Sequence, residues 1–457
     1  MKKLQLYNSF SNSLEDFVPL DESNIRIYVC GPTVYASPHV GNARPLVIFD
    51  ILFRLLRELY PKVTYVRNIT DVDDKINAKA RDRKISIGEL TNEVIEEFHK
   101  NTALLNVLPV TYEPRATAHI AEMLEIIQKL IDNDFVYESQ GHVLFRVRKM
   151  PNYGMLSKRN LDDMIAGSRV EIAPYKEDPM DFVLWKPSEE GMPAWNSPWG
   201  KGRPGWHIEC SAMSRKYLGE QFDIHAGGQD LMFPHHENEL AQNFGAFGCI
   251  MANYWIHNGM LLVNGQKMSK SLGNIISLDD ALRRHDGEIV RYILLSSHYT
   301  KTLDWTDKLV AQAKHSLNRL YGALKKGDIK IAGVVENSDN PVLEALCSNL
   351  NTPLALHTLH EIADTIYKST SSDEINELSG QLKNGAALLG LLSKECEEWF
   401  RQESKLISEE DIERLIAERK LAKAEKDFRR ADEIREKLLE KGIKIEDTST
   451  GTIWRNV

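Results

Sequence analysis

One stretch near the N-terminus constrains the possible fold more than any other part of the sequence. Residues 25–29 alternate apolar and polar side chains, as a strand does, and Gly31-Pro32 ends this pattern. Residues 43–60 repeat apolar side chains at helical spacing, and residues 62–70 have the composition of a second strand. A helix between two strands is a crossover connection, so both strands should lie parallel in one sheet. This order predicts the first unit of a nucleotide-binding α/β fold.

The turn between the first strand and its helix carries two groups that could do chemistry. Cys30 follows the strand directly, and His39-Val-Gly-Asn42 opens the helix. Backbone N–H groups and the helix dipole favour an anion at such a helix start. A cysteine at a strand end is more often a small buried hydrophobic residue, however, and a histidine near a helix start is most often a cap. Each group therefore needs partners from elsewhere in the chain.

Composition excludes a few classes of protein. The chain has 457 residues, enough for two to four domains with substantial cores. No segment approaches the roughly 18 apolar residues of a membrane helix, and the N-terminus lacks the apolar core of a signal peptide, so we expect no membrane partner. The five scattered cysteines argue against a disulfide framework and predict a reducing cytoplasm. The net charge of −9 disfavours broad nonspecific binding to nucleic acid but leaves a local basic face open.

The predicted sheet is interrupted after its second strand. Residues 75–108 and 113–134 have mainly helical patterns. Phe135 to Arg148 then has the pattern of a hairpin that turns at Gln140-Gly141, and a region rich in Pro, Gly, Trp and Met follows. We therefore interpret residues 110–205 as an insertion that splits the α/β domain.

The sheet resumes beyond this insertion. Phe222 to His225 is a predicted strand, and a helix is expected from Pro234 to Phe247. A further strand is expected from Tyr254 to Val263, directly before the strong hairpin-turn signal of Asn264-Gly265. From about residue 305 the patterns are nearly all helical.

A group of metal-ligand side chains lies in Pro234-His-His-Glu-Asn-Glu239. His235 and Glu239 are four residues apart and would share a face of a helix, whereas His236 is paired with Leu240 at this spacing. Two thiols from other segments could complete a set whose softness and number suit zinc. Those thiols are Cys30 and Cys210. Spacing alone cannot link these segments, so a surface pair and two packing cysteines remain the alternative.

A second candidate site is the segment Lys267-Met-Ser-Lys-Ser271, which follows the predicted hairpin turn and should be a mobile loop. Two lysines with hydroxyl groups between them can neutralise the charge of a triphosphate without covalent chemistry. The sequence has neither a P-loop nor a Gly-x-Gly-x-x-Gly after a strand, which disfavours kinase-like and dehydrogenase functions. A solvated surface loop is the usual alternative for a Lys-Ser segment.

Together, these motifs resemble those of the class I aminoacyl-tRNA synthetases. His39-Val-Gly-Asn42 is similar to the HIGH signature of that class, and Lys267 to Ser271 matches its KMSKS signature. Within the class, the chain resembles the cysteinyl-tRNA synthetase family over essentially its full length. The other segments that carry this resemblance are Tyr28–Tyr35, Val66–Lys75, Met180–Lys186, Gly202–Met213, Phe222–His225, Asp230–Glu239 and Gly451–Trp454.

The resemblance implies roles for individual residues. The implied zinc ligands are Cys30, Cys210, His235 and Glu239. The implied amino-acid pocket is formed by Thr33, Thr70, Trp206 and His225. ATP would be bound by His39, Gly41, Asn42, Asp230 and Lys270, with His39, Asn42, Lys267 and Lys270 as the catalytic groups.

Two departures from the family pattern and one further surface complete this set of expectations. Asn42 replaces the last histidine of HIGH, and Ala226-Gly-Gly stands where the family commonly has three glycines. The methyl group at Ala226 is expected to tighten the backbone near the adenylate. At the C-terminus, a basic face and a stacking platform could contact tRNA, with a solvated charged helix as the alternative. These tRNA-binding candidates are Arg429, Arg430, Arg435, Lys437 and Trp454.

The predicted fold class is α/β, with a Rossmann-like parallel-sheet catalytic domain split by an insertion and followed by a helical bundle and a small C-terminal module. The catalytic domain is expected at 1–109 and 206–265, and the inserted connective domain at 110–205. The remaining divisions are a KMSKS-loop and stem-contact region at 266–304, a tRNA-binding bundle at 305–402 and an anticodon-binding module at 403–457.

The resemblance implies ATP-dependent ligation of L-cysteine to tRNA(Cys) through a cysteinyl-adenylate. It implies one Zn²⁺ per subunit that selects the thiolate, Mg²⁺ bound with ATP, a monomer and a cytoplasmic location. One alternative is a cysteine ligase that uses an amino-sugar acceptor, although such relatives lack the terminal module that residues 403–457 supply. A second alternative is a non-catalytic nucleic-acid-binding module descended from a synthetase.

Overall fold

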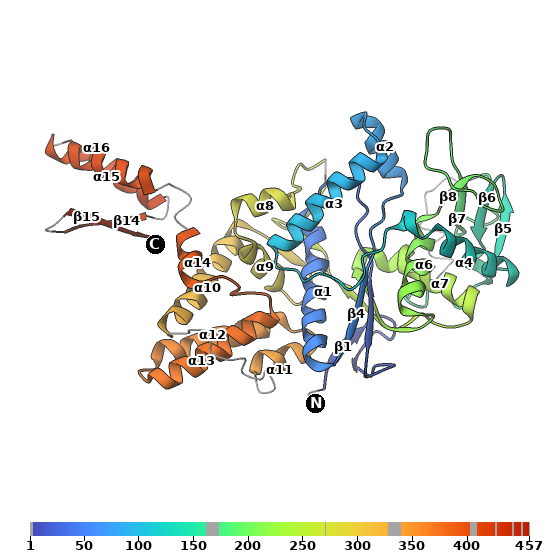
Figure 1. Cartoon of the computed structure of the whole chain (residues 1–457), viewed down its shortest axis with the longest axis horizontal. Helices are drawn as coiled ribbons and strands as arrows, with labels where there is room; N and C mark the ends of the chain where they lie inside the picture. Colours follow the sequence, from blue (N-terminus) through green and yellow to red (C-terminus); the bar gives the residue numbers. More distant parts are fainter. Residues whose placement is uncertain are drawn as a thin grey trace. The chain divides into compact units, whose positions relative to one another are not determined.

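The computed structural model describes residues 3–160, 173–269, 271–327, 340–402, 409–425, 427–440, 443–448 and 451–456 (Figure 1). The chain divides into two compact units, and each is described by itself. The first unit comprises Met1–Ala313, Val335–Leu359 and Asn384–Leu391. The second comprises Lys314–Val334, His360–Lys383 and Leu392–Val457.

The first unit contains the predicted parallel sheet. Its four strands, within the described part of the chain, lie in the order β10-β9-β3-β4 and all run parallel. Helix α1 (Val40–Leu59) connects the inner strand β3 to the edge strand β4, which confirms the predicted crossover. The strands are β3 (Ile25–Val29), β4 (Val63–Arg67), β9 (Phe222–Gly228) and β10 (Ala252–Asn258).

Between β4 and β9 the chain forms a second, antiparallel sheet of the order β5-β6-β7-β8. Gln140 and Gly141 both have positive φ, of 49° and 76°, which is the backbone of the tight hairpin turn that the sequence predicts here. The strands are β5 (Val136–Ser139), β6 (His142–Phe145), β7 (Phe182–Pro187) and β8 (Gly202–Pro204). The helices of this part are α2 (Asp74–Arg83), α3 (Ile87–Leu104), α4 (Ile120–Asp132) and α6 (Trp206–Leu218).

Two predicted boundaries are wrong. The helix expected to start at Pro234 is α-helical only from Glu237, as α7 (Glu237–Phe247), because the turn before it, Met232–His236, is π-helical. The strand expected from Tyr254 to Val263 is two strands, because the chain leaves the sheet after β10. Its continuation β11 (Leu261–Val263) pairs with β12 (Gln266–Lys267) and β13 (Leu303–Trp305).

The remaining elements are short strands near the N-terminus and helices beyond the second sheet. The N-terminal strands are β1 (Gln5–Asn8) and β2 (Ser13–Asp16). The helices are α8 (Leu278–Arg284), α9 (Gly287–Leu295), α10 (Asp307–Lys326), α11 (Pro341–Cys347), α12 (Thr352–Lys368), α13 (Ser372–Leu388) and α14 (Cys396–Gln402). None of the described helices is both long enough and apolar enough to cross a membrane.

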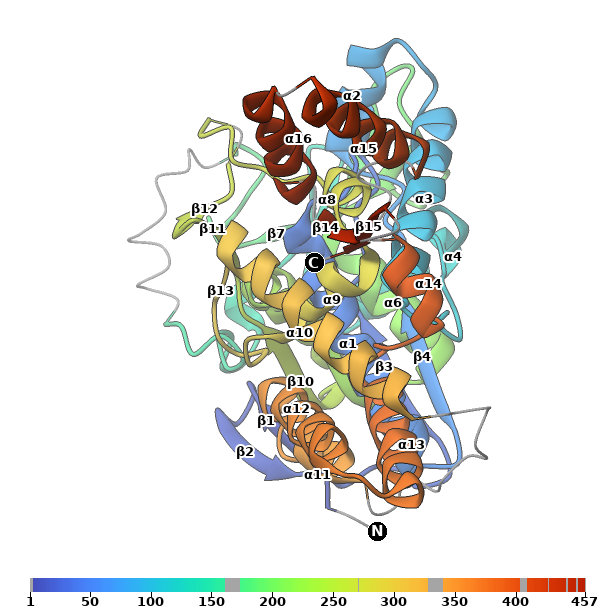
Figure 2. The same ribbon diagram turned by 90° about the vertical axis from the view of Figure 1, so that its left-hand side faces the viewer.

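The C-terminal part of the second unit is a small α/β module. Helices α15 (Glu409–Ala424) and α16 (Phe428–Glu440) pack side by side, and α16 also packs against the hairpin of β14 (Ile443–Thr448) and β15 (Gly451–Asn456) (Figure 2). Its own small core holds the module together through Ile412, Leu415, Ile434, Leu438, Ile443 and Ile445. This arrangement fits the change of sequence character that occurs beyond residue 403.

Candidate active site

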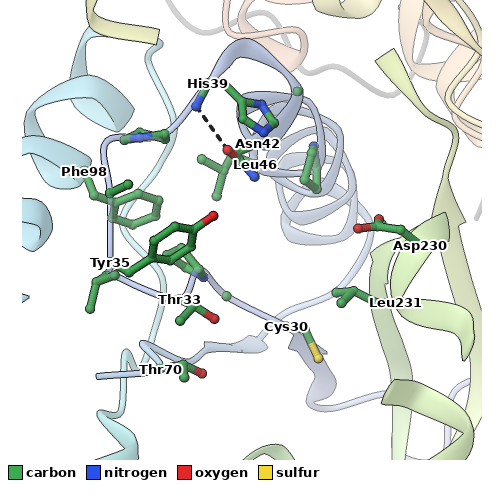
Figure 3. A pocket seen from close by; sticks show the side chains of 18 of the residues that line it. Cys30, Thr33, Tyr35, His39, Asn42, Leu46, Thr70, Phe98, Asp230 and Leu231 are labelled. Atoms are coloured by element: carbon green, nitrogen blue, oxygen red, sulfur yellow. Dashed lines mark hydrogen bonds between the residues drawn. The ribbon is translucent and has the colours of Figure 1, made fainter. Parts of the chain in front are cut away.

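A cavity of about 490 Å³ opens at the carboxyl end of the parallel sheet, where sites of α/β folds lie (Figure 3). The loop that joins β3 to α1, from Cys30 to His39, forms much of its wall. Cys210 lines it from α6, and Asp230 and His235 line it from the turns that follow β9, the strand beside β3. The cavity therefore brings together both groups that the sequence placed in the first turn.

The metal-ligand candidates meet at one end of this cavity. One ligand atom each from Cys30, Cys210, His235 and Glu239 lies within 4.8 Å of the others. The Cys30 and Cys210 Sγ atoms are 3.8 Å apart, Cys30 Sγ is 3.5 Å from Glu239 Oε1, and that oxygen is 3.0 Å from His235 Nε2. Ligands of a tetrahedral zinc lie roughly 3.3–3.8 Å apart, given bonds of about 2.0–2.3 Å. The two distances from Cys30 Sγ fall in this range, and the 3.0 Å between His235 and Glu239 lies somewhat below it. The four residues thus fit a zinc ion in chemistry, and nearly so in spacing.

His236, which sequence reasoning set aside as a ligand, also belongs to this cluster, as does His225. His236 Nε2 lies 3.3 Å from Cys30 Sγ, and its other ring nitrogen contacts His257 Nε2 at 2.8 Å. Cys30, Glu239, His236 and His225 even form a second set of four atoms within the same limit. Only the first set has members besides Cys30 that line the cavity, namely Cys210 and His235. We therefore assign the first set as the candidate ligands and the other histidines as their supports.

Charges at this end are paired although they are buried. Burial works against an ionised Glu239, but the neighbouring His225 and His235 hold the pKa of its carboxyl well below the ordinary range. Burial likewise opposes a charged imidazole at His235, but Glu239 raises its pKa to about 10. Burial would raise the pKa of the Cys210 thiol, but the contacts with Cys30 and His235 lower it to about 6. A thiolate at this position is the form that binds metal.

Trp206, Thr33 and Thr70, which the resemblance assigns to the amino-acid pocket, line the same cavity. The Trp206 ring stacks on His235 with 4.4 Å between ring centroids and stays 40 % exposed. The Thr70 hydroxyl donates a hydrogen bond of 2.9 Å to the buried Glu209, a residue that sequence reasoning missed. Thr33 pairs with Thr70 through a backbone bridge, which fixes the spacing of the two threonines.

His225, which the family resemblance places in the amino-acid pocket, is not among the residues that line the cavity. It is fully buried, and its Nε2 lies 2.9 Å from Glu239 Oε2, behind the ligand cluster rather than among the lining residues. Ala226, the departure from three glycines, is also fully buried and does not line the cavity. A Cβ at Gly227 would lie 2.9 Å from His236 Cε1, so the close approach of that ring requires glycine there.

The other end of the cavity is the start of helix α1. Asn42 Oδ1 accepts the backbone N–H of His39 at 3.0 Å, which caps the helix (Figure 3). His39 Nδ1 is buried and has no hydrogen-bond partner among the described residues. Burial lowers the pKa of His39, against the opposing effect of Asp230. A Cβ at Gly41 would lie 2.8 Å from Met268 Cε, so glycine lets the signature loop approach the helix start.

Asp230, Lys267 and Met268 complete the wall at this end. Asp230 and Lys267 are exposed to solvent. The predicted phosphate-binding residue Lys270 lies outside the described residues. Of the described residues of the signature loop, Lys267 at the end of β12 and Met268 just after it line the cavity.

A buried arginine that the sequence analysis did not single out stabilises the end of the cavity at the start of α1. The Arg44 guanidinium, from α1, donates hydrogen bonds to the carbonyl oxygens of Gly259, Met260 and His298 at 2.8, 2.7 and 3.2 Å. Burial lowers its pKa to about 10. These contacts hold the segment between β10 and β11, which leads into the signature loop, against the helix that carries His39.

The tRNA-binding candidates lie in the C-terminal module and are partly engaged there. Arg429 pairs with Glu433, and Arg430 pairs with both Glu418 and Glu433. The Trp454 indole packs against the core of the module and donates its N–H to Glu413 at 3.0 Å. The side chains of Arg435 and Lys437 are exposed. The arginines therefore share their surface with carboxylates rather than forming a purely basic face.

Two protein families match the chain. Residues 16–315 match the family described as "tRNA synthetases class I (C) catalytic domain". Residues 409–455 match the "Cysteinyl-tRNA ligase anticodon binding domain". The first match covers the parallel sheet, the cavity and the signature segments, and the second covers the small C-terminal module.

Individual proteins agree with these families. The chain is 51 % identical to the cysteine–tRNA ligase of Rhodospirillum rubrum over 99 % of both chains. It is also 51 % identical to that of Granulibacter bethesdensis, over 98 % of this chain and 95 % of the relative. Among solved structures, the methionyl-tRNA synthetase of Mycobacterium tuberculosis bound by methionyl-adenylate superposes with a TM-score of 0.60 at 15 % identity, covering 85 % of this chain and 95 % of that one. The chain belongs to the cysteine–tRNA ligase family of the class I aminoacyl-tRNA synthetases.

Proposed function

We propose that the chain ligates L-cysteine to tRNA(Cys) in two steps, through a cysteinyl-adenylate formed from ATP. The observation that carries this proposal is the single cavity with a four-ligand metal cluster at one end and the helix start of the HIGH-like signature at the other. Such a cavity can hold a thiol-bearing amino acid and a nucleoside triphosphate at the same time.

Cys30, Cys210, His235 and Glu239 would hold the zinc, supported by His225, His236 and His207 behind them. When bound, zinc supplies a soft Lewis acid that prefers a thiolate over a neutral hydroxyl. A difference of one atom in an apolar pocket gives only about 1–3 kcal/mol of discrimination. Metal chemistry therefore accounts for selecting cysteine over serine better than pocket shape does. Thr33, Thr70 and Trp206 would position the rest of the amino acid.

In the first step, the cysteine carboxylate attacks the α-phosphorus of ATP, the bond to the β-phosphate oxygen breaks, and pyrophosphate leaves. His39 and Asn42 donate hydrogen bonds to phosphate oxygens, and the low pKa of His39 keeps its imidazole neutral. Gly41 leaves room for the nucleotide, and Asp230 binds its ribose. Lys267 and Lys270, with Mg²⁺, offset the charge that builds on pyrophosphate.

In the second step, the terminal ribose 2′-hydroxyl of the tRNA takes the cysteinyl group and AMP leaves. Arg429, Arg430, Arg435 and Trp454 would contact the anticodon arm. Phosphate contacts from arginines would weaken as the salt concentration rises. Because Trp454 is half-buried, it would present one edge or one face of its ring to a base rather than stand free.

Two assays test this proposal. Cysteine-dependent exchange of pyrophosphate into ATP tests adenylation, and charging of a transcript with the cysteine anticodon tests transfer. We expect activity in both, with serine at least a hundredfold poorer as a substrate. Exchange without charging, together with ligation of cysteine to an amino-sugar acceptor, would favour the other ligase class. Absence of exchange in the zinc-loaded protein would contradict the proposed enzyme altogether.

A further inference from the structure

A chain of three hydrogen bonds leads from the metal cluster to a turn near the N-terminus. His236 Nε2 lies 3.3 Å from Cys30 Sγ, and His236 Nδ1 lies 2.8 Å from His257 Nε2. His257 Nδ1 is in turn 2.9 Å from the hydroxyl oxygen of Ser9. Ser9, His257 and His236 are only 9 %, 6 % and 0 % exposed. Their polar side-chain atoms are therefore paired mainly with one another rather than with solvent.

The turn that carries Ser9 is held in place without its hydroxyl group. Ser9 lies between β1 and β2, and its backbone N–H donates to the Trp255 carbonyl at 2.8 Å. The Asn8 side chain accepts the N–H of Trp255 at 3.0 Å and donates to the Asn253 carbonyl at the same distance. Because these bonds fix the turn on β10, the hydroxyl group can be removed while the turn stays in position.

The direction of donation along this chain follows from its metal end. A metal-bound cysteine is a thiolate, which has no proton, so His236 Nε2 must donate to Cys30. A fully buried imidazole is favoured in its neutral form with one N–H, which leaves His236 Nδ1 as an acceptor. Burial lowers the pKa of His257 to about 3, so this ring also has one N–H. That N–H must be at Nε2, which leaves His257 Nδ1 to accept from the Ser9 hydroxyl.

This arrangement of protons determines which ligand set can bind the metal. His236 belongs to the second set of four residues, whose ligand atoms also lie within 4.8 Å of one another. A ligating imidazole binds through a nitrogen that holds no proton, and its other N–H donates to a neighbouring group. His236 has the opposite arrangement, because Nε2, which faces Cys30, holds the proton and Nδ1 accepts. The metal is therefore left with the first set.

We propose that Ser9 and His257 are positioning residues, which fix the Nε2–H tautomer of His236 and so deny this ring to the metal. The ion is thereby kept on the set that includes Cys210 and His235, which line the cavity, whereas His236 does not. The inference rests on the proposed function, because it concerns the ion that would bind the substrate thiolate.

The tautomers can be measured directly in the full-length, zinc-loaded wild-type protein. Nitrogen NMR of isotope-labelled histidine distinguishes a ring nitrogen that holds a proton from one that does not. The signals are assigned by their loss in His236→Gln and His257→Gln. We expect both rings to hold their proton on Nε2. A proton on Nδ1 of either ring would overturn the inference.

Removing the Ser9 hydroxyl tests its effect on the metal. In Ser9→Ala, His257 can adopt the other tautomer, and His236 then offers Nε2 to the ion. We expect the metal affinity, measured by competition with a chelator, to fall about 10–100-fold, as for other groups behind a metal site. In the cobalt-substituted variant, thiolate-to-cobalt absorption should weaken, because His236 replaces Cys210. Ser9→Thr keeps the hydroxyl and should behave as wild type, and Ser11→Ala, at an exposed serine of the same turn, is the matched control.

The outcomes separate a role in the tautomer from a role in the fold. If Ser9→Ala keeps the metal affinity and absorption of wild type, the inference is wrong. If its affinity falls while the absorption is unchanged, Ser9 acts through the fold, and the inference also fails. Adding His236→Gln to Ser9→Ala should restore the wild-type absorption, because the alternative ligand is gone, and no recovery would contradict a shift to His236.

The proposed function can fail separately from this inference. A wild-type protein that binds no metal would contradict the metal site of the proposed function before the tautomers are considered. A wild-type protein that binds metal and shows both expected tautomers, but neither exchanges pyrophosphate nor charges tRNA, would contradict the proposed function and leave the positioning roles of Ser9 and His257 intact.

Discussion

The two ends of the cavity are built on opposite electrostatic plans. At the metal end, Glu239, His235 and Cys210 are buried and already contact one another or neighbouring histidines. At the nucleotide end, Asp230 and Lys267 are exposed, and His39 Nδ1 has no partner among the described residues. Buried charges need partners, whereas exposed groups can wait for a ligand. The difference indicates that the metal end is organised before a ligand binds, whereas the groups at the other end are free to take one. In the proposed function, these ligands are the amino acid and the nucleotide.

Removing one candidate ligand from the metal end of the cavity should give the largest loss of activity. Cys210→Ser keeps the size of the side chain but loses the soft ligand, so we expect loss of the metal. Substitutions behind a metal site already cost about 10–100-fold, so cysteine-dependent exchange should fall at least a hundredfold. Metal content by mass spectrometry and the exchange rate measure the two effects separately.

The matched control for this variant is Cys249→Ser, at a half-buried thiol outside the ligand cluster. It should keep both metal and activity. A Cys210→Ser protein that binds no metal yet still prefers cysteine to serine as wild type does would show that the organised end does not select by metal.

At the open end, Asn42 allows capping and phosphate contact to be separated. Asn42→Asp keeps the oxygen that accepts the His39 N–H, but replaces the amide donor with a negative charge. Stability should therefore be retained, while adenylation falls about a hundredfold, as when one transition-state donor is removed. Asn42→Ala should lose both, with a stability cost of about 0.5–2 kcal/mol.

Denaturant unfolding and pyrophosphate exchange measure these two properties of the Asn42 variants. If Asn42→Asp lost stability as well as activity, the residue would act only through the fold of the helix start. The contrast between the two ends of the cavity would then fail at Asn42, because the start of α1 would also be fixed by internal contacts.

The smallest effect concerns the acid sensitivity of His39. Burial lowers its pKa below the usual value of about 6.5, so the unfolded chain takes up this proton first as the pH falls. As the pH falls below about 6.5, proton binding by the unfolded chain lowers the stability of the folded protein. This loss stops once the pH is below the lower pKa of His39 in the folded protein. His39→Asn should lose less stability than wild type between pH 7.5 and pH 5, as measured by thermal unfolding. An equal loss in both proteins would place His39 in a more solvated setting.

The sequence predicts local structure well where one pattern controls it. The β3–α1–β4 crossover and the Gln140-Gly141 turn are confirmed, because alternation and turn chemistry depend on few residues. It misses His236 because a regular helix through Pro234 pairs that residue with Leu240. The partners of His236 are Cys30 and His257, which belong to distant segments that local spacing cannot link to it.

The candidate site depends on contacts that no local pattern encodes. The resemblance to the synthetase family, rather than spacing, linked Cys30 to Cys210 and His235. The role of Arg44 could not be predicted for the same reason, because its partners are carbonyl groups of residues more than two hundred positions later. His225 has the sequence position of a pocket residue, but its side chain supports Glu239 because that carboxylate accepts its ring N–H.

The central pairing of β3 with β9 also sets an order of assembly during synthesis. β3 can pair with β4 once residue 67 has emerged, but its other edge must wait for β9, which begins at Phe222. At about 5–20 residues per second, the ribosome needs on the order of 10 s to make the intervening segment. During that time an apolar strand keeps one edge unpaired, which is a template for aggregation. The length of the insertion thus governs how long the nascent chain depends on protection.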